Sequence, residues 1–238
     1  MRFRNGPKPL SVWAVLAAAG RGERLGSDRP KAFARLAGRP LLAESLERLE
    51  NSDWIERIVI AAPPEWEEPS ILVAEEIVAT KVHSAITGGE TRSESVRLAL
   101  EEVPEEVAVV LVHDAARPVL PEDVIERLLA PLGEGWDGAV PALPLADTIK
   151  RVEGDRVVET LARGEHVAVQ TPQAFVADVL RQALAGDVST AADCASLVEA
   201  RGGRVKVVVG DPRLLKVTDE SDLAVVESWL ETAQPTAE

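Results

Sequence analysis

Short apolar runs rich in β-branched residues alternate with longer amphipathic stretches along most of this chain. The apolar runs occupy residues 12–17, 58–62, 107–112, 138–142 and 205–209. They have the length of buried strands, and most are separated by segments of helical period. Strands that alternate with helices form a mostly parallel sheet covered by helices. The pattern therefore predicts an α/β protein.

Several amphipathic stretches carry signals for the start of a helix. Proline precedes two of them, at Pro40 and Pro121, where the missing first-turn N–H costs no hydrogen bond. Thr91 and Glu94 have the spacing of a capping box. Acidic residues follow Thr218 directly, as is typical of a first turn. We expect helices to begin at these four points.

The stretch from about 144 to 170 breaks the alternation. Residues 148–152 and 156–160 are short runs of alternating polarity joined by a Glu-Gly-Asp turn. They predict a protruding β-hairpin arm. Because an isolated two-stranded hairpin is marginally stable, we expect the arm to pack on a second copy of the chain and form a homodimer.

Composition narrows the class of protein. With 46% hydrophobic residues the chain can bury a core, and its formal charge of −14 argues against binding to nucleic acid or an anionic membrane. No run is long and apolar enough to span a bilayer. The single cysteine, Cys194, cannot form an internal disulfide, and the three histidines add no zinc-ligand spacing. We expect a protein of the reducing cytoplasm.

The first residues have the layout of a secretory signal peptide. Residues 1–8 are basic, and residues 10–19 are apolar and end in small residues. However, the apolar run continues directly into a glycine-rich segment, and its Val12, Val15 and Leu16 suit a buried strand. We interpret the run as the first strand of the fold.

A loop of glycine and small residues, 17–26, follows this strand. Glycines in that place let backbone N–H groups approach phosphate oxygens, and Arg24 and Lys31 add positive charge. The alternative is an ordinary strand-to-helix turn with solvated basic residues. The two cations favour a triphosphate site. Its loop contacts would be Ala18, Ala19, Gly20 and Gly22.

Two other kinds of phosphate-binding loop do not fit. Gly20, Gly22 and Gly26 miss the dinucleotide spacing G-x-G-x-x-G by one residue, and no ribose-binding acid ends the next strand. The Walker pattern G-x-x-x-x-G-K-[ST] is absent. These features argue against a dehydrogenase and against a P-loop kinase or ATPase.

A carboxylate and a guanidinium follow the run at 107–112, at the sheet edge where open α/β proteins bind ligands. Asp114 could hold a magnesium ion or a substrate hydroxyl, and Arg117 could bind a phosphate. A structural Asp–Arg pair that caps the loop is the alternative. We expect His113 to be packed and hydrogen-bonded rather than to act as a base.

Two weaker signals complete the set. Gly88 and Gly89 allow close approach to a base or ribose, and the helix start behind them offers Arg92 and Ser95 as hydrogen-bonding groups. Lys216 follows the last apolar run. Taken alone, the glycines are an ordinary turn and the lysine an ordinary solvated cation.

Together these segments resemble the 2-C-methyl-D-erythritol 4-phosphate cytidylyltransferase family of the non-mevalonate isoprenoid pathway. The matching strings lie in order at 18–24, 30–31, 88–93, 113–118, 147–150, 171–173 and 216–218. The resemblance implies one nucleotidyltransferase domain of Rossmann-like fold over residues 1–238, with helices on both faces of the sheet. It also implies a homodimer interlocked by the arm. The implied reaction transfers CMP from CTP to methylerythritol phosphate and releases pyrophosphate.

The resemblance implies roles for individual residues as well. The catalytic cations would be Arg24, Lys31 and Lys216. The nucleotide contacts would be Ala18, Ala19, Gly20, Gly22, Gly89, Arg92, Ser95, Asp114 and Ala115. The acceptor contacts would be Asp114, Arg117, Thr148, Arg163, Thr171 and Lys216, with Thr148 and Arg163 reaching into the site of the second copy. Mg²⁺ or another divalent cation is expected mainly on the CTP phosphates, with Asp114 as its candidate protein ligand.

One segment departs from the family, which usually has Thr-Asp-Asp/Glu-Ala where this chain reads Ala192-Asp193-Cys194-Ala195. The missing acid could alter activity, or the segment could be structural at a helix start. Two other functions stay open. One is a sugar-phosphate or cofactor nucleotidylyltransferase with another acceptor pocket, and the other is a nucleotide-binding module without turnover. Without the resemblance, nothing ranks CTP above other triphosphates.

Overall fold

The computed structural model describes residues 10–20 and 29–233. The strands are β1 (Val12–Ala17), β2 (Arg35–Leu36), β3 (Arg39–Pro40), β4 (Arg57–Ala62), β5 (Val82–Thr87), β6 (Val109–Asp114), β7 (Gly138–Pro144), β8 (Lys150–Glu153), β9 (Arg156–Thr160), β10 (Val167–Val169), β11 (Gln173–Val176) and β12 (Val205–Val209). The α-helices are α1 (Leu41–Glu50), α2 (Glu67–Glu76), α3 (Arg92–Leu100), α4 (Glu122–Gly133), α5 (Ala177–Leu184), α6 (Cys194–Ala200) and α7 (Glu220–Ala233). Within the described ranges no helix is long and apolar enough to cross a membrane.

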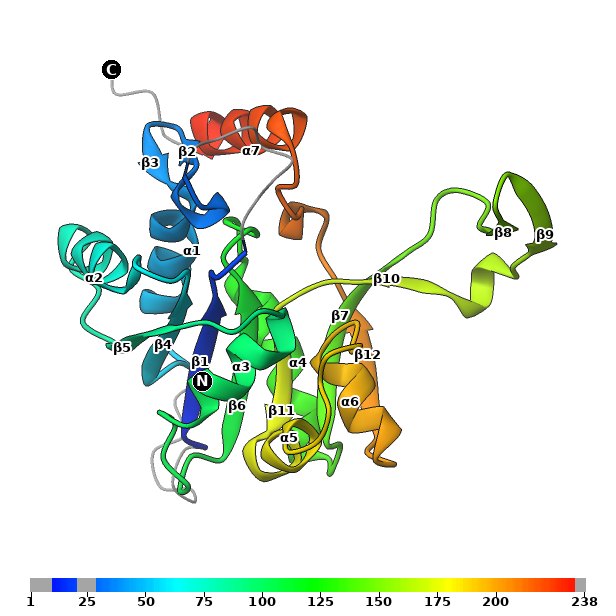
Figure 1. Ribbon diagram of the computed structural model, residues 1–238, viewed down its shortest axis with the longest axis horizontal. Coiled ribbons are helices and arrows are strands. Elements are labelled where there is room, and N and C mark those ends of the chain that lie inside the picture. Colours follow the sequence, from blue (N-terminus) through cyan, green and yellow to red (C-terminus); the bar gives the residue numbers. More distant parts are fainter. Residues whose placement is uncertain (1–9, 21–28, 234–238) are drawn as a thin grey trace.

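One sheet organises the molecule, with the strand order β10-β7-β11-β6-β1-β4-β5 and β12 paired to β7. β1, β4, β5 and β6 are parallel, whereas β10 and β11 run antiparallel to their neighbours. The chain places β4 and β5 on one side of β1 and then β6 on the other side (Figure 1). The predicted mostly parallel sheet is confirmed. Its carboxyl edge at β1 and β6 is a switch point of the kind where open α/β sheets bind ligands.

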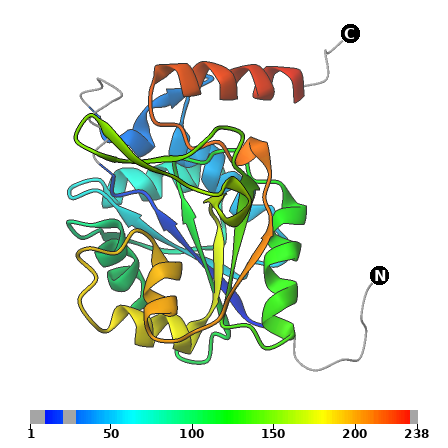
Figure 2. The ribbon, with the colours of Figure 1, turned by 90° about the vertical axis from the view of Figure 1, so that its right-hand side faces the viewer.

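Alternate residues of β1 enter two separate hydrophobic cores. Val12, Ala14 and Leu16 pack with α1, α2 and α4, while Trp13 and Val15 pack with α3, α5 and α6. In Figure 2, α4 lies to the right of the sheet and α5 to its lower left. Because strand side chains alternate between faces, a strand covered on both sides is apolar throughout. Helices therefore cover both faces, as expected.

The predicted helix starts are present. Thr91 accepts a hydrogen bond from the Glu94 N–H, and the Glu94 carboxylate accepts one from the Thr91 N–H, so a capping box opens α3. Helices α1 and α4 begin directly after Pro40 and Pro121, and α7 begins just after Thr218.

The structure differs from the sequence pattern in the extent of several elements. β6 continues to Asp114, so this residue ends the strand instead of following it. β7 continues to Pro144 and leads into the arm. The pattern does not predict β5, β11, α2 or α5, and for α6 it indicates only a helix start near Asp193. β5 lies at the sheet edge and is only partly buried, so it lacks the continuous apolar run of a central strand.

The predicted hairpin arm is present and lies away from the sheet and its helices (Figure 1). β7 leads out to it, and β10 returns and pairs antiparallel with β7. β8 and β9 form the hairpin, which turns at Gly154, where φ is 58°. Val152 and Val157 on these strands are 56% and 54% exposed. The arm thus presents apolar surface to its surroundings.

A small third core lies beneath α7. Leu36, Leu41, Val217 and Val226 are buried together there. Val217 directly follows Lys216 in the chain, so this core anchors the backbone that carries the lysine.

Candidate active site

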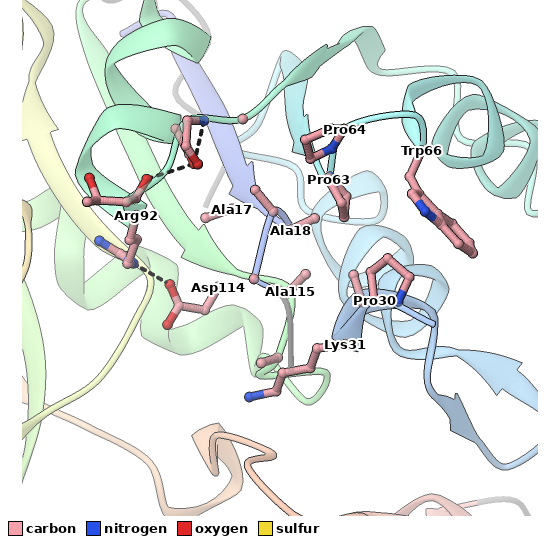
Figure 3. A pocket seen from close by; sticks show the side chains of 18 of the residues that line it. Ala17, Ala18, Pro30, Lys31, Pro63, Pro64, Trp66, Arg92, Asp114 and Ala115 are labelled. Carbon is pink, nitrogen blue, oxygen red and sulfur yellow. Dashed lines mark hydrogen bonds and ion pairs between the residues drawn. The ribbon is translucent and has the colours of Figure 1, made fainter. Parts of the chain in front are cut away.

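A cleft of about 870 Å³ opens at the carboxyl ends of β1, β5 and β6. It is lined by residues 17–20, 29–32, 63–64, 66, 88–92, 95, 114–116, 216 and 218. In Figure 3, Arg92 and Asp114 lie to the left, Pro63 and Trp66 to the right, and Lys31 below. The volume falls within the range of small-molecule sites, roughly 300–1,000 Å³.

Close packing of the Gly88-Gly89 turn against the end of β1 forms one wall of the cleft. A Cβ at Gly88 would collide with the side chain of Ala19 and would lie 2.9 Å from Ser95 Oγ. The Gly89 N–H donates to Ser95 Oγ at 3.1 Å, and the Ser95 hydroxyl donates to the Thr91 carbonyl at 2.9 Å. Glycine at 88 is therefore required by close approach, and Ser95 fixes the turn beside the cleft.

Asp114 joins two cations at the cleft wall. Its Oδ1 accepts a hydrogen bond from Arg92 Nε at 2.7 Å, and its Oδ2 pairs with Lys216 Nζ at 2.8 Å. The side chains of Asp114, Arg92 and Lys216 are 8%, 23% and 41% exposed. Two cations and one anion leave this triad with a net positive charge. Such a wall suits an anionic substrate.

Burial and the two cations act in opposite directions on Asp114. Burial alone would raise its pKa, but Arg92 and Lys216 hold that pKa well below its usual range. Burial would likewise lower the pKa of Arg92, but the Asp114 carboxylate raises it above its usual value. Asp114 and Arg92 are therefore both charged at neutral pH.

His113 and Thr171 support Asp114 from behind. The Asp114 N–H donates to Thr171 Oγ1 at 3.0 Å, which lies 3.2 Å from His113 Nδ1. His113 Nε2 lies 3.0 Å from the Arg117 carbonyl, which can only accept, so Nε2 carries the proton and Nδ1 accepts from Thr171. Burial lowers the pKa of His113 to about 4. The prediction of a packed, hydrogen-bonded histidine is confirmed, and Thr171 holds the Asp114 backbone instead of lining the cleft.

Arg117 occupies a different place from the one its sequence position suggested. Its Nη1 donates to the Leu214 carbonyl, and the residue is not part of the cleft lining. The alternative of a structural Asp114–Arg117 pair is wrong, because Arg92 and Lys216 take the carboxylate. Arg117 instead ties the loop after β6 to the segment that carries Lys216.

The other predicted site residues fall into three groups. The cleft lining includes Ala18, Ala19, Gly20, Lys31, Gly89, Arg92, Ser95, Asp114, Ala115 and Lys216. Gly22 and Arg24 lie outside the described residues. Thr148 and Arg163 lie exposed on the arm, where Arg163 donates to the Ala146 carbonyl at 2.8 Å, and neither lines the cleft of its own chain.

The donor set does not favour Asp114 as a metal ligand. Both of its carboxylate oxygens already accept from cations. Among the residues that the structure describes, no group of three or more His, Cys, Asp or Glu side chains could hold a metal ion. A cation in this cleft would need most of its oxygen ligands from elsewhere.

Sequence reasoning missed the wall formed by Pro63, Pro64 and Trp66. The Trp66 ring packs on Phe33 with the ring centroids 4.4 Å apart. These residues carry no ionisable group or motif spacing, so only the position of Pro63 just after β4 could have pointed to them.

The segment that departs from the family pattern lies at the start of α6. Asp193 caps this helix by accepting from the Ser196 N–H at 2.9 Å, and it also accepts from Gln173 Nε2 at 2.7 Å. Cys194 is buried, and its Sγ accepts from Arg92 Nη1 at 3.6 Å. Burial raises the pKa of Cys194 to about 11, so the thiol is neutral. Because position 194 holds a neutral thiol here, Asp114 is the carboxylate that pairs with Arg92.

Known proteins match this chain in sequence and in fold. The family model described as IspD, 2-C-methyl-D-erythritol 4-phosphate cytidylyltransferase, matches residues 12–232. A protein with that family name from Saccharopolyspora erythraea is 44% identical over 225 residues, covering 93% of this chain and 100% of that one. Another from Frankia casuarinae is 43% identical over 225 residues, covering 94% of this chain and 83% of that one.

Solved structures agree. The crystal structure of 2-C-methyl-D-erythritol 4-phosphate cytidylyltransferase from Thermus thermophilus has a TM-score of 0.72 at 31% identity, covering 91% of this chain and 98% of that chain. The matches extend over nearly the full length and include both the cleft and the arm. The chain therefore belongs to the 2-C-methyl-D-erythritol 4-phosphate cytidylyltransferase family.

Proposed function

We propose that the reaction of this family takes place in the cleft at the ends of β1, β5 and β6. CMP is transferred from CTP to 2-C-methyl-D-erythritol 4-phosphate, and pyrophosphate is released. The observation that carries this proposal is the triad of Arg92, Asp114 and Lys216, which puts two cations around one buried carboxylate in the same cleft as Lys31.

We assign the triphosphate of CTP to the end of β1. The backbone of residues 18–20 and the side chain of Lys31 line the cleft together there. N–H groups and an ammonium stabilise the charge that grows on phosphate oxygens as the α-phosphorus becomes five-coordinate. Arg24, outside the described residues, is proposed to act with Lys31.

Cytosine and ribose are assigned to the wall of Gly89 and Ser95. Glycine is required at position 89 because a Cβ there would collide with Glu94, and this close packing lets the Gly89 backbone line the cleft. Because Ser95 fixes the turn through two hydrogen bonds, this wall is preorganised before the nucleotide binds.

The methylerythritol phosphate is assigned to the Lys216 side of the cleft. The Lys216 ammonium is partly exposed and can meet the acceptor phosphate, while Asp114 keeps it in place and can accept a hydrogen bond from an acceptor hydroxyl. The acceptor phosphate then attacks the α-phosphorus in line, with pyrophosphate leaving. Positioning and electrostatic stabilisation supply the catalysis, and no covalent enzyme intermediate is needed.

The arm is proposed to complete the acceptor site of a second copy in a homodimer. Thr148 and Arg163 lie exposed on an arm that stands away from its own body, so a partner's cleft is a surface they can reach (Figure 1). Exposed valines on the same arm supply apolar area for such a contact.

We propose that Mg²⁺ or another divalent cation is held mainly by the phosphates of CTP. Both oxygens of Asp114 already accept from cations, and triphosphate oxygens are the ligands that Mg²⁺ prefers. The cation would offset phosphate charge while the residues of the cleft orient the substrates. We place the enzyme in the cytoplasm, since its one cysteine is a buried free thiol.

The test is pyrophosphate release with CTP, UTP, GTP and ATP, each with methylerythritol phosphate, with glucose 1-phosphate, and with no acceptor. We expect release only when methylerythritol phosphate is present, and fastest with CTP. Preference for the sugar phosphate would indicate a different nucleotidylyltransferase. No release with any pair would indicate a nucleotide-binding module without turnover.

A further inference from the structure

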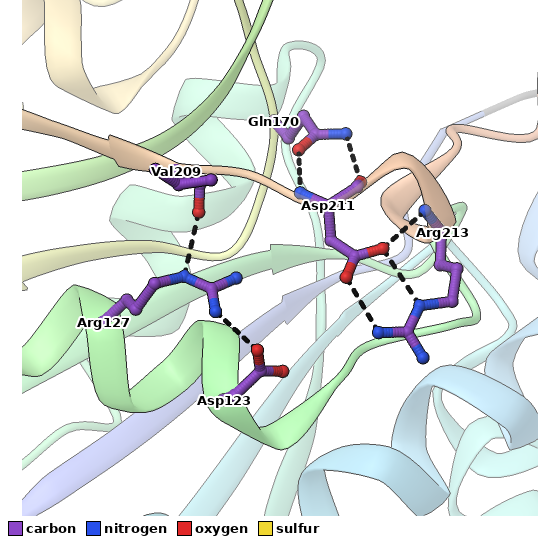
Figure 4. A network of polar contacts seen from close by, with 6 residues as sticks. All are labelled: Asp123, Arg127, Gln170, Val209, Asp211 and Arg213. Carbon is purple, nitrogen blue, oxygen red and sulfur yellow. Dashed lines mark hydrogen bonds and ion pairs between the residues drawn. The ribbon is translucent and has the colours of Figure 1, made fainter.

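The chain that returns from the arm enters the body at Gln170, a buried residue with 6% exposure. Its carboxamide pairs with the backbone of Asp211 in both directions (Figure 4). Gln170 Nε2 donates to the Asp211 carbonyl at 2.9 Å, and the Asp211 N–H donates to Gln170 Oε1 at 3.1 Å. The side-chain amide supplies both the donor and the acceptor that this pairing needs. Gln170 therefore fastens the base of the arm to residue 211.

Asp211 starts the short segment that ends at Lys216. Gly210, the residue before Asp211, packs closely on the Gln170 amide. A Cβ at position 210 would collide with Gln170 Oε1. The Gly210 N–H also donates to the Ala142 carbonyl at 2.9 Å. The segment is thus held at its beginning by two sets of contacts, one from the Gln170 amide and one from the Ala142 carbonyl.

Further contacts hold the segment closer to the lysine. The Leu214 carbonyl accepts from Arg117, and the Val217 N–H donates to the Ala116 carbonyl at 2.8 Å. With the start at Asp211 and these two points fixed, Lys216 reaches Asp114 Oδ2 at 2.8 Å.

The next residue in the chain, Thr171, acts on the other partner of the same ion pair. Its hydroxyl accepts from the Asp114 N–H at 3.0 Å. Two consecutive residues at the base of the arm are therefore linked to the Asp114–Lys216 pair. Thr171 bonds to the backbone of Asp114, and Gln170 bonds to the start of the segment that carries Lys216.

We propose that Gln170 is a positioning residue that keeps Lys216 within ion-pair distance of Asp114 and joins the arm to the active site. The role rests on the proposed function, because it acts through the lysine that meets the acceptor phosphate. Gln170 itself does not line the cleft. Its removal takes away both hydrogen bonds that fix residue 211 and leaves only the Gly210 contact at the start of the segment. Misplacement of a reacting group by about 1 Å costs on the order of 100-fold in rate.

The rest of the network supplies a matched control. Asp211 uses its carboxylate for Arg213, at 2.8 and 3.0 Å, and only its backbone for Gln170. Arg127 donates to the Val209 carbonyl at 3.0 Å from the outer side of the same network (Figure 4). Arg127→Met thus disturbs the neighbouring backbone without touching the Gln170 amide.

The experiment compares kcat and the KM of each substrate in the full chain, Gln170→Leu, Gln170→Glu and Arg127→Met. Gln170→Glu keeps the size of the side chain but loses the N–H donor. It therefore tests the proposal even if the leucine variant does not fold. We expect kcat to fall by about 10- to 100-fold in both Gln170 variants, with an unchanged KM for CTP. Arg127→Met should keep the kcat of the full chain.

A double-mutant cycle separates positioning from general loss of structure. In a Lys216→Met background, at enzyme concentrations that record the residual rate, the Gln170 variants should cause no further loss, because the group they position is gone. A loss of equal size in both backgrounds, or an equal loss in Arg127→Met, would overturn the inference. Turnover that is insensitive to Gln170 would overturn this inference alone. Absence of turnover in the unaltered chain would overturn the proposed function and this inference with it.

Discussion

Replacement of Asp114 by asparagine tests how much the carboxylate between Arg92 and Lys216 contributes to the stability of the fold. The variant keeps the shape and one oxygen but removes the anion between Arg92 and Lys216. Arg92 Nε lies 2.7 Å from Asp114 Oδ1, and its side chain is 23% exposed. Breaking a buried pair from one side costs about 3–5 kcal/mol, because the remaining charge stays buried without compensation.

The Lys216 pair should contribute much less to stability. Its nitrogen lies 2.8 Å from Asp114 Oδ2, but its side chain is 41% exposed, so water screens the interaction. Exposed pairs contribute about 0–1 kcal/mol. We therefore expect Asp114→Asn to lower the free energy of unfolding by about 3 kcal/mol, and Lys216→Met by no more than about 1 kcal/mol.

Urea unfolding at pH 7 measures both effects. With a slope of about 1–3 kcal/mol per molar urea, the midpoint of Asp114→Asn should fall by about 1 M or more. A domain stabilised by about 5–15 kcal/mol remains folded after such a loss. Equal midpoints for the two variants, or a midpoint of Asp114→Asn close to that of the unaltered chain, would refute the assignment of Arg92 as the dominant partner.

Two further predictions concern acid and the arm. The folded pKa of His113, about 4, lies below the unfolded value of about 6.5, so stability present above pH 6.5 is lost as pH falls toward 4. Between pH 7 and 5 the loss should be about 2 kcal/mol, and His113→Gln should remove it in urea titrations; an unaltered slope in that variant would count against the assignment. Deletion of residues 148–160 should give monomers in analytical sedimentation, and an unchanged mass would contradict the proposed role of the arm.

The central strands could be predicted because burial on both faces makes them apolar throughout. This held for β1, which is buried almost throughout and whose bounds the apolar run matches. The run at 205–209 also matches the bounds of β12, although that strand is largely exposed. β5 could not be predicted in this way, because it lies at the edge of the sheet and its side chains are partly exposed. The helix α2 could not be predicted from amphipathic spacing, because its apolar residues do not gather on one face. The arm could be predicted because its polarity alternates with a period of two around a Gly154 turn.

The site was partly predictable for a different physical reason. The rule that ligands bind at the carboxyl edge of an open sheet placed Asp114 in the cleft. Its partner could not be chosen from sequence, since Arg117 lies three residues away and Arg92 lies far back in the chain. Because β6 extends to Asp114, this residue shares a face with Val112, which packs in the α3 core. The carboxylate therefore meets Arg92 at the start of α3.

The most direct measurement is the turnover of Lys31→Met with CTP and methylerythritol phosphate, recorded beside its urea midpoint. Lys31 lines the cleft and is assigned to the triphosphate, and removal of one group that stabilises transition-state charge costs on the order of 100- to 1,000-fold in rate. We predict a loss of about that size, with the midpoint unchanged. Turnover close to that of the unaltered chain would contradict the assignment of this cleft as the site of cytidylyl transfer.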